Sequence, residues 1–311
     1  MQYFTDTEKF IDRKEVNRAI ETAFADHGRG LVEMPPKVYI TLPEGDFRTM
    51  PAYIPSLSLA GVKVVNVHPG NPARGLPTVM ALTVILDIAT GTPVALLNAT
   101  KLTDMRTGAA GAVAAKYLSS KKEIVLGIIG TGRQAEAQYQ AILQEFSISE
   151  VKCWSRNSVH AEKFAGSLTV HDARSVPVEK ACDCDILVTT TPSRMPVVMN
   201  EWVRDGTHIN AIGADAPGKQ ELDPLLLKRA MVIVDDMSQA VHSGEVNVPI
   251  SQGIFTREEI AGTLGEVVIG LKKRKNPDQI TIFDSTGLAI QDLAIAAIAM
   301  RNGRVIDLPF P

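Results

Sequence analysis

Apolar residues in the first hundred positions change from helical spacing to the alternating pattern of strands. Val16, Ile20 and Phe24 fall on one helical face and Gly28 and Gly30 follow them, which predicts one helix with a glycine stop. The segments beyond it are rich in β-formers and are separated by turn residues, so they predict a meander of strands. These strands are Lys37–Leu42, Phe47–Tyr53, Gly61–Val67, Thr78–Ile88 and Pro93–Asn98. Because short hairpin-like turns connect them, we expect consecutive strands to be antiparallel.

From Glu123 onward, apolar strands alternate with helical segments, a rhythm typical of a parallel sheet covered on both faces. An alanine-rich helix, Arg106–Leu118, precedes this region, and a last helix, Ile290–Asn302, follows it. We therefore predict an α/β protein with a Rossmann-type doubly wound parallel sheet over 119–289. An α+β substrate-binding and dimerisation domain with an antiparallel sheet should comprise 1–118 with 290–311. The strands predicted for the parallel sheet are Ile124–Ile129, Val151–Trp154, Ile186–Thr190, His208–Ile212, Val232–Asp235 and Ile280–Asp284.

Composition and charge narrow the class of protein. The chain of 311 residues, 45% hydrophobic and 22% charged, suits two soluble globular domains. Its net charge of -3 gives no electrostatic reason to expect nucleic acid or an anionic membrane as partner. Its apolar stretches are shorter than the roughly 18 residues of a membrane span, and the N-terminus lacks the pattern of a signal peptide. Three cysteines cannot make a disulfide framework, so we expect a cytoplasmic location. Cys182 and Cys184 lack the further ligands of a zinc site, so we expect no metal.

The strand predicted before Gly130 leads directly into a glycine-rich turn and then a helix. The turn reads Gly130-Thr131-Gly132-Arg133-Gln134-Ala135, which is G-x-G-x-x-A in the context that a dinucleotide fingerprint requires. In such a motif the first glycine allows the tight turn, the second lets the pyrophosphate approach the backbone, and the alanine allows close packing. The N–H groups at the start of the helix then bind the phosphates. The alternative is a glycine-rich turn in another α/β fold.

The tip of the next strand should decide which dinucleotide binds. A carboxylate there would bind the ribose 2′-hydroxyl and repel a 2′-phosphate. This chain instead has Ser155-Arg156-Asn157, and an arginine can stack on adenine or pair with a phosphate. NADP(H) is therefore favoured over NAD(H), unless Arg156 is only a solvated loop residue.

Further motifs, in this order and over nearly the whole chain, resemble the ornithine cyclodeaminase/μ-crystallin family. They are Val67–Pro72, Gly75–Leu82, Asp104–Gly111, Thr189–Ser193, Ile209–Asp215, Gly218–Leu222 and Asp284–Asp292. Within the family, Met34–Tyr39 and Gly206–Asp223 are most similar to the archaeal-type alanine dehydrogenases. The tip Trp154–Asn157 departs from them, since they carry an acidic residue there, and is closer to the NADPH-binding μ-crystallins. NAD(H) therefore stays possible.

The resemblance implies a homodimer in which the antiparallel sheets of two subunits pair, with each active site between the two domains of one subunit. It also implies a reaction through an imino acid, in which hydride leaves or joins the carbon that bears the amine.

Several residues of the first domain are implied in binding this substrate. The resemblance places Arg48 and Arg106 at its carboxylate, which an arginine fork binds well; for each, the alternative is a structural ion pair. Strand alternation turns Lys63 opposite to Val62 and Val64, and a lysine in a partly apolar cleft can act as acid or base. Lys63 could also neutralise the carboxylate, or merely reach solvent.

Other candidates lie in loops and at strand ends. The resemblance assigns Asp215 to the substrate amine and to proton transfer, although an aspartate there could simply form a turn. Thr78 is a possible substrate contact or an ordinary strand residue. His68 is expected to be structural, with contact to substrate or a phosphate as the alternative. The remaining residues expected at the cofactor are Thr190, Thr191, Ser285 and Gly287.

The preferred function is a reversible oxidative deamination of a small L-amino acid, in first place alanine to pyruvate and ammonia. One alternative keeps the site and changes the net reaction, to ornithine cyclodeamination or to reduction of a cyclic ketimine. Another is a non-catalytic NADP(H)-binding protein of the crystallin kind, which the retention of Lys63, Arg106 and Asp215 disfavours.

Overall fold

The computed structural model describes residues 1–310 and divides the chain into two compact units. One comprises residues 1–106 and those from 288 onward, and we call it the mixed-sheet unit. The other, residues 107–287, is the parallel-sheet unit. The first boundary was predicted after residue 118, twelve residues later, where the helix that contains residue 106 ends. Within residues 1–310, no helix is both long and apolar enough to cross a membrane.

The mixed-sheet unit is built on seven strands in the order β15-β1-β6-β5-β4-β3-β2. The neighbours from β2 to β6 are antiparallel, as predicted, whereas β1 pairs with β6 in parallel. Strands β1 and β15 were not predicted; each has four residues and they form one edge of the sheet. The strands are β1 (Gln2–Thr5), β2 (Val38–Leu42), β3 (Gly45–Ile54), β4 (Leu59–Val67), β5 (Val79–Leu86), β6 (Pro93–Asn98) and β15 (Arg304–Asp307).

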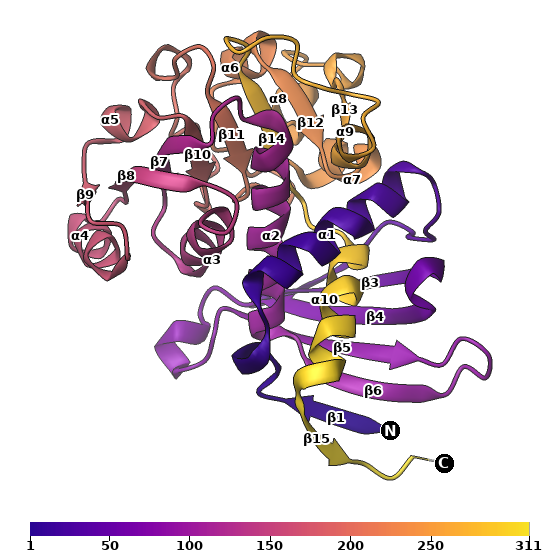
Figure 1. Cartoon of the computed structure of the whole chain (residues 1–311). Helices are drawn as coiled ribbons and strands as arrows, with labels where there is room; N and C mark the ends of the chain where they lie inside the picture. The colour runs from indigo at the N-terminus through magenta and orange to yellow at the C-terminus, as the bar shows by residue number, and fades with distance from the viewer. Residues whose placement is uncertain (311) are drawn as a thin grey trace. The chain divides into compact units, whose positions relative to one another are not determined.

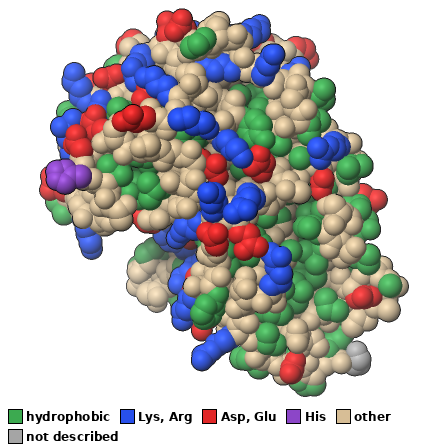
Figure 2. All heavy atoms as spheres, viewed as in Figure 1, with side chains coloured by type: hydrophobic (Ala, Val, Ile, Leu, Met, Phe, Trp, Pro, Cys, Tyr) green, Lys and Arg blue, Asp and Glu red, His purple; other side chains and the backbone are tan. Residues whose placement is uncertain are grey.

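Two helices, α1 (Arg13–Gly28) and α10 (Ala289–Asn302), lie across one face of this sheet (Figure 1). Helix α1 begins where the Asp12 side chain accepts a hydrogen bond from the N–H of Lys14, and it buries its predicted apolar face. Hydrophobic side chains gather over the two helices in Figure 2, where a groove of 280 Å³ lies between them. On β4, alternation turns Lys63 to the helix-covered face and leaves Val64 exposed on the other.

The parallel-sheet unit has eight strands, all parallel, in the order β13-β12-β14-β11-β10-β7-β8-β9. From β7 to β9, successive strands are added toward one edge of the sheet. From β10 onward, strands are added on the other side of β7, so the direction of winding reverses between β7 and β10. Ligands of open α/β sheets bind at the carboxyl ends of the strands on either side of such a reversal. The strands are β7 (Glu123–Ile129), β8 (Ser147–Trp154), β9 (Ala173–Ser175), β10 (Ile186–Thr189), β11 (His208–Ala211), β12 (Met231–Val234), β13 (Gly262–Thr263) and β14 (Thr281–Asp284).

The predicted fold class, a doubly wound parallel sheet together with an antiparallel meander, is confirmed. Helix α2 (Thr100–Leu118) begins six residues before its predicted start, so the expectation that Arg106 opens this helix was wrong. The polar residues of its first turn hid that start, where the Asn98 side chain accepts a hydrogen bond from the N–H of Thr100. The helices that lie wholly within the parallel-sheet unit are α3 (Arg133–Ile142), α4 (Ser158–Ser167), α5 (Val178–Cys182), α6 (Pro224–Arg229), α7 (Met237–Ser243), α8 (Asn247–Ser251) and α9 (Leu264–Val268).

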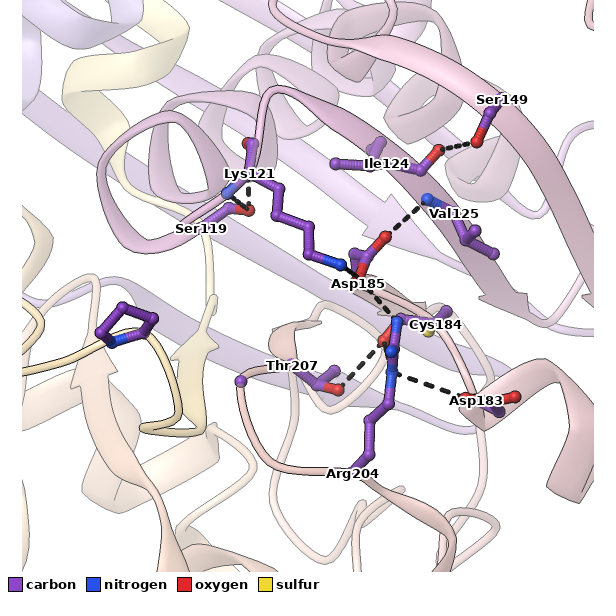
Figure 3. Close-up of polar contacts among 12 residues, drawn as sticks. Ser119, Lys121, Ile124, Val125, Ser149, Asp183, Cys184, Asp185, Arg204 and Thr207 are labelled. Carbon is purple, nitrogen blue, oxygen red and sulfur yellow. Dashed lines mark hydrogen bonds and ion pairs between the residues drawn. The ribbon is translucent and has the colours of Figure 1, made fainter.

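At the amino-terminal edge of the parallel sheet, Asp185 joins three segments (Figure 3). Its carboxylate accepts hydrogen bonds from the N–H of Val125 at 2.9 Å, from Lys121 Nζ at 2.8 Å and from Arg204 Nη2 at 2.6 Å. Burial opposes ionisation, but these donors outweigh it and lower the pKa of Asp185 below its ordinary value. This anchor lies at the opposite end of the strands from the glycine-rich turn.

Candidate active site

The glycine-rich turn has the geometry that its sequence predicted. Strand β7 ends at Ile129, and Gly130 follows with φ of 92°, a backbone conformation that side chains disfavour. A Cβ on Gly130 would also lie 2.9 Å from Thr190 Oγ1, because β10 ends directly beside the turn. The protein itself therefore requires glycine at this position.

Gly132 differs from Gly130, because the protein's own atoms do not require glycine there. Its φ of -87° suits any residue, and a Cβ built there meets no protein atom within 4 Å. As the N-cap of α3, it has no side chain to occupy the first N–H groups of the helix. A phosphate group that approaches the backbone would use this space, so the turn fits the pyrophosphate of a dinucleotide.

A cavity of 520 Å³ opens at this turn, at the carboxyl ends of β7, β8 and β10. It is lined by seven of the predicted cofactor residues: Gly130, Thr131, Gly132, Ser155, Arg156, Thr190 and Thr191. Six further lining residues were not predicted: Trp154, His160, Pro192, Ser193, Arg194 and Val197. The lining contains two arginines and no carboxylate, which makes the cavity suited to an anionic ligand.

The other predicted cofactor residues lie outside this lining. Arg133, Gln134 and Ala135 form the first turn of α3, where Ala135 is fully buried against the sheet. The Asn157 side chain caps α4 by accepting hydrogen bonds from the N–H groups of Val159 and His160. A cofactor contact through any of them stays a prediction.

Ser285 and Gly287 are buried just beyond β14. The N–H groups of Thr286 and Gly287 donate to the Asp235 carboxylate at 2.6 and 2.7 Å, so that aspartate fixes the segment. Neither Ser285 nor Gly287 lines the cavity, and their contact with a cofactor stays a prediction.

Hydrogen bonds to the buried side chain of Glu221, a residue that was not predicted, fix the loop that carries Thr190 and Thr191. Its carboxylate accepts hydrogen bonds from Thr189 Oγ1 at 2.8 Å, from the N–H of Thr191 at 2.5 Å and from the N–H of Gly213 at 2.8 Å. One fully buried side chain therefore fixes the loops that follow β10 and β11.

In the mixed-sheet unit, predicted residues meet in a buried cluster of charges. Lys63 Nζ donates to Asp292 Oδ1 at 2.8 Å, and Arg106 Nε donates to the same oxygen at 2.9 Å. Arg106 Nη1 also donates to Gln291 Oε1 at 2.8 Å. The four side chains come from β4, α2 and α10, and each is at most 6% exposed.

Burial is the largest cause that lowers the pKa of Lys63, to about 7. The positive charges of Arg106 and Lys37 lower it further, while the charge and hydrogen bond of Asp292 raise it. A lysine with a pKa near neutrality can both donate and accept a proton under ordinary conditions. The lowered pKa agrees with what was expected of Lys63, but its catalytic role stays a prediction.

Asp292 and Gln291 were missed as site residues, although the run in which they lie was recognised as a family motif. The signal was present: they are two adjacent polar residues in a helix that is otherwise apolar from Ala289 to Ala299. Buried polar side chains in such a helix need partners, and here these partners are Arg106 and Lys63.

The remaining predicted substrate residues have other neighbours. Arg48 Nε donates to Asp46 at 2.9 Å and its guanidinium lies over the Tyr39 ring, 4.9 Å from the centroid. Thr78 precedes β5 rather than lying in a strand, contrary to the prediction, and its carbonyl accepts the N–H of His68.

Asp215 lies in the loop after β11, where Lys219 Nζ is 2.5 Å from its carboxylate. His68 Nδ1 lies 3.0 Å from the Asn66 side chain, in keeping with a structural role. The substrate-binding roles of Arg48, Lys63, Thr78 and Arg106 and the catalytic roles of Lys63 and Asp215 stay predictions.

Comparison with known proteins identifies the family. An alanine dehydrogenase of Archaeoglobus fulgidus is 50% identical over 300 residues, which cover 96% of this chain and 92% of that protein. Among solved structures, an archaeal alanine dehydrogenase dimer with bound NAD superimposes with a TM-score of 0.94, at 48% identity over 99% of both chains. A Δ1-pyrroline-2-carboxylate reductase of Thermococcus litoralis, in complex with NADH and L-proline, has a TM-score of 0.93 at 36% identity over 97% of both chains. The family model of the ornithine cyclodeaminase/mu-crystallin family matches residues 1–303, and the chain belongs to that family.

Proposed function

We propose that this protein is a nicotinamide-dependent amino-acid dehydrogenase, with L-alanine as its first candidate substrate. The observation that carries the proposal is its identity at half of all aligned positions with the A. fulgidus alanine dehydrogenase, along almost the full length of both chains. The net reaction converts L-alanine, NAD(P)⁺ and water to pyruvate, ammonium, NAD(P)H and a proton. The cofactor, when bound, accepts or supplies the hydride.

The buried charge cluster supports this chemistry. We assign the positive charges of Arg106 and Lys63 to the substrate carboxylate. Arg48, which pairs with Asp46 on β3, is the third cation that we assign to it. The imino acid formed on loss of hydride must gain water and release ammonia, and both steps move protons. Lys63, with a pKa of about 7, is the group we assign to these transfers, together with Asp215.

For the cofactor we favour NADP(H). Ser155 and Arg156 line the cavity at the position where an acidic residue would select NAD(H), and Arg194 adds positive charge. The solved relatives contain NAD or NADH, so NAD(H) stays the alternative that the assay must include.

We also propose that the protein acts as a homodimer through its mixed sheet. On the face away from α1 and α10, the register sets Val38, Thr49, Val64 and Leu82 side by side across four strands. The three hydrophobic side chains are 39–55% exposed, and exposed apolar patches of this kind mark protein interfaces. Sedimentation should give a dimer, and the double variant Val64→Glu/Leu82→Glu should sediment as a monomer.

A steady-state screen tests the proposed reaction. Pyruvate with ammonia, other 2-oxo acids with ammonia, L-ornithine, and cyclic ketimines are each assayed with NADH and NADPH, and with the oxidised forms for the reverse reaction. Oxidation of NAD(P)H that requires both pyruvate and ammonia supports the proposal. The T. litoralis relative makes cyclic ketimine reduction the second candidate, and turnover of Δ1-pyrroline-2-carboxylate without turnover of pyruvate would replace the first. Ammonia release from ornithine without net cofactor change would identify a cyclodeaminase.

A further inference from the structure

Asp292 is placed unusually for a buried carboxylate, because one of its oxygens carries both ion pairs. Lys63 Nζ and Arg106 Nε both donate to Oδ1, at 2.8 and 2.9 Å. Among residues 1–310, Oδ2 has no hydrogen-bond partner, although Asp292 is only 3% exposed. Buried carboxylate oxygens usually have partners, so an arrangement that leaves one without them calls for an explanation.

We propose that Asp292 is a positioning residue of the reaction, which holds Lys63 and Arg106 on one oxygen so that both face the same substrate carboxylate. The inference rests on the proposed dehydrogenase function and adds Asp292 to the residues assigned to that function above. Because the two cations share Oδ1, neither can move without breaking a hydrogen bond in a buried site. Gln291 supports the arrangement, since it accepts from Arg106 Nη1 and also from the N–H of Leu288 at the start of α10.

The charges of the cluster give Asp292 a second effect. Three charged groups act on Lys63 from the elements around it: Arg106 on α2, Asp292 on α10 and Lys37 before β2. Asp292 is the negative one, and without it a buried ammonium would face two positive neighbours. With it, Lys63, Arg106 and Asp292 together change from a charge of +1 to zero when Lys63 loses its proton. A bound substrate carboxylate then favours the protonated form, so binding takes up a proton that catalysis can use.

A titration of Lys63 tests this directly, without any assay of turnover. Protein labelled with ¹³C at lysine Cε is titrated by NMR, and the Lys63 signal is assigned by its loss in Lys63→Met. We expect the midpoint for Lys63 to be at least about one pH unit lower in Asp292→Asn than in the wild-type protein. Equal midpoints in the two proteins would overturn the proposal.

The matched control is Asp26→Asn, which removes another buried carboxylate of the same unit, one that accepts a hydrogen bond from Ser56. It should leave the Lys63 midpoint unchanged, and an equal shift in both variants would overturn the specific role of Asp292. If Asp292→Asn does not fold, Asp292→Glu carries the test, because it keeps the charge and displaces it by one methylene group. Its Lys63 midpoint should stay near that of the wild type while kcat/KM falls at least about tenfold. Wild-type kcat/KM in Asp292→Glu would contradict positioning.

The pH profile of turnover separates this inference from the proposed function. In an active enzyme, the limb of kcat/KM that follows Lys63 should move with the NMR midpoint in Asp292→Asn, and Asp26→Asn should keep the wild-type profile. A wild-type protein that turns over no amino or imino acid would refute the proposed function, while the Lys63 titration would still decide whether Asp292 controls this lysine.

Discussion

The carboxylate of Glu245 accepts a hydrogen bond from the backbone N–H of Glu221 at 2.9 Å, in a region where both side chains are fully buried. Its Oε1 also accepts from the N–H of Leu222 at 2.7 Å. Glu221 in turn fixes the loop that carries Thr191, so two acidic side chains in series support one wall of the cofactor cavity. Burial is the main cause that raises the pKa of Glu245 well above its ordinary value, and the neighbouring Glu221 adds to it.

The stability of the protein should therefore depend on pH through Glu245. The folded state keeps this proton at pH values where an unfolded glutamate, with a pKa of about 4.3, has lost it. The folded state then binds more protons, so the contribution of Glu245 to stability is complete at low pH and is lost as pH rises through the folded pKa. Glu245→Gln keeps an oxygen that accepts both N–H groups and cannot ionise. Relative to the wild type, its free energy of unfolding should increase with pH between 5 and 8, by at most about 1.4 kcal/mol per pH unit.

Urea unfolding at a series of pH values measures this difference. Glu258→Gln, which changes an exposed glutamate of the same unit, serves as the control and should follow the wild type at every pH. If the free energies of unfolding of Glu245→Gln and the wild type differ by the same amount at every pH between 5 and 8, Glu245 is ionised in the folded protein.

Substitutions at the two glycines of the cofactor turn should have different effects, one on the stability of the fold and the other on cofactor binding. Gly130→Ala puts a side chain at a φ of 92° and close to Thr190, which should destabilise the protein by roughly 1–3 kcal/mol. Gly132→Ala meets no protein atom, so its stability should stay within about 0.5 kcal/mol of the wild type. If Gly132 exists to admit a phosphate, this second variant should bind NADPH at least about tenfold more weakly, a loss of about 1.4 kcal/mol. Thermal unfolding and fluorescence titration measure the two effects, and unchanged affinity in Gly132→Ala would remove the phosphate from this position.

Local patterns predicted most of the elements and part of the site. Alternation along β4 placed Lys63 opposite to Val62 and Val64 and left open whether it reaches solvent; the structure buries it. The strand–turn–helix context of Gly130 and Gly132 predicted the turn at which the cavity opens. The edge strands β1 and β15 were missed because four residues are too few to establish a period. Asp292 stood out as a polar residue in an apolar helix, but its partner could not be predicted: its contact with Lys63 joins residues 229 positions apart, and no spacing along a chain reveals such a pair.

The anchor at Asp185 should contribute to stability without affecting catalysis. Asp185→Asn removes the charge that pairs with Lys121 and Arg204, and we expect a loss of roughly 1–2 kcal/mol in the free energy of unfolding at pH 7. The pKa of Asp185 is lowered in the folded state, so its contribution is present above the ordinary aspartate pKa and is lost as pH falls through the folded value. The difference between variant and wild type should therefore shrink in acid, while kcat/KM at pH 7 stays unchanged. If the free energy of unfolding of Asp185→Asn stays as far below that of the wild type in acid as at pH 7, the charge of Asp185 is not what stabilises this edge of the parallel sheet.

Arg156 should decide the choice between the two dinucleotides. It lies at the rim of the cavity beside Ser155, where the 2′-phosphate of NADPH would meet its guanidinium. Arg156→Ala should lower kcat/KM for NADPH at least about tenfold and leave that for NADH within about twofold, since NADH lacks this phosphate. Arg174→Ala, which removes an exposed arginine of the same unit that pairs with Glu150, should alter neither value. Adding Ser155→Asp to Arg156→Ala should then favour NADH, because the new carboxylate accepts hydrogen bonds from the ribose hydroxyl and repels a phosphate. An equal fall for both dinucleotides in Arg156→Ala would mean that the arginine contacts a part of the cofactor that NADH and NADPH share.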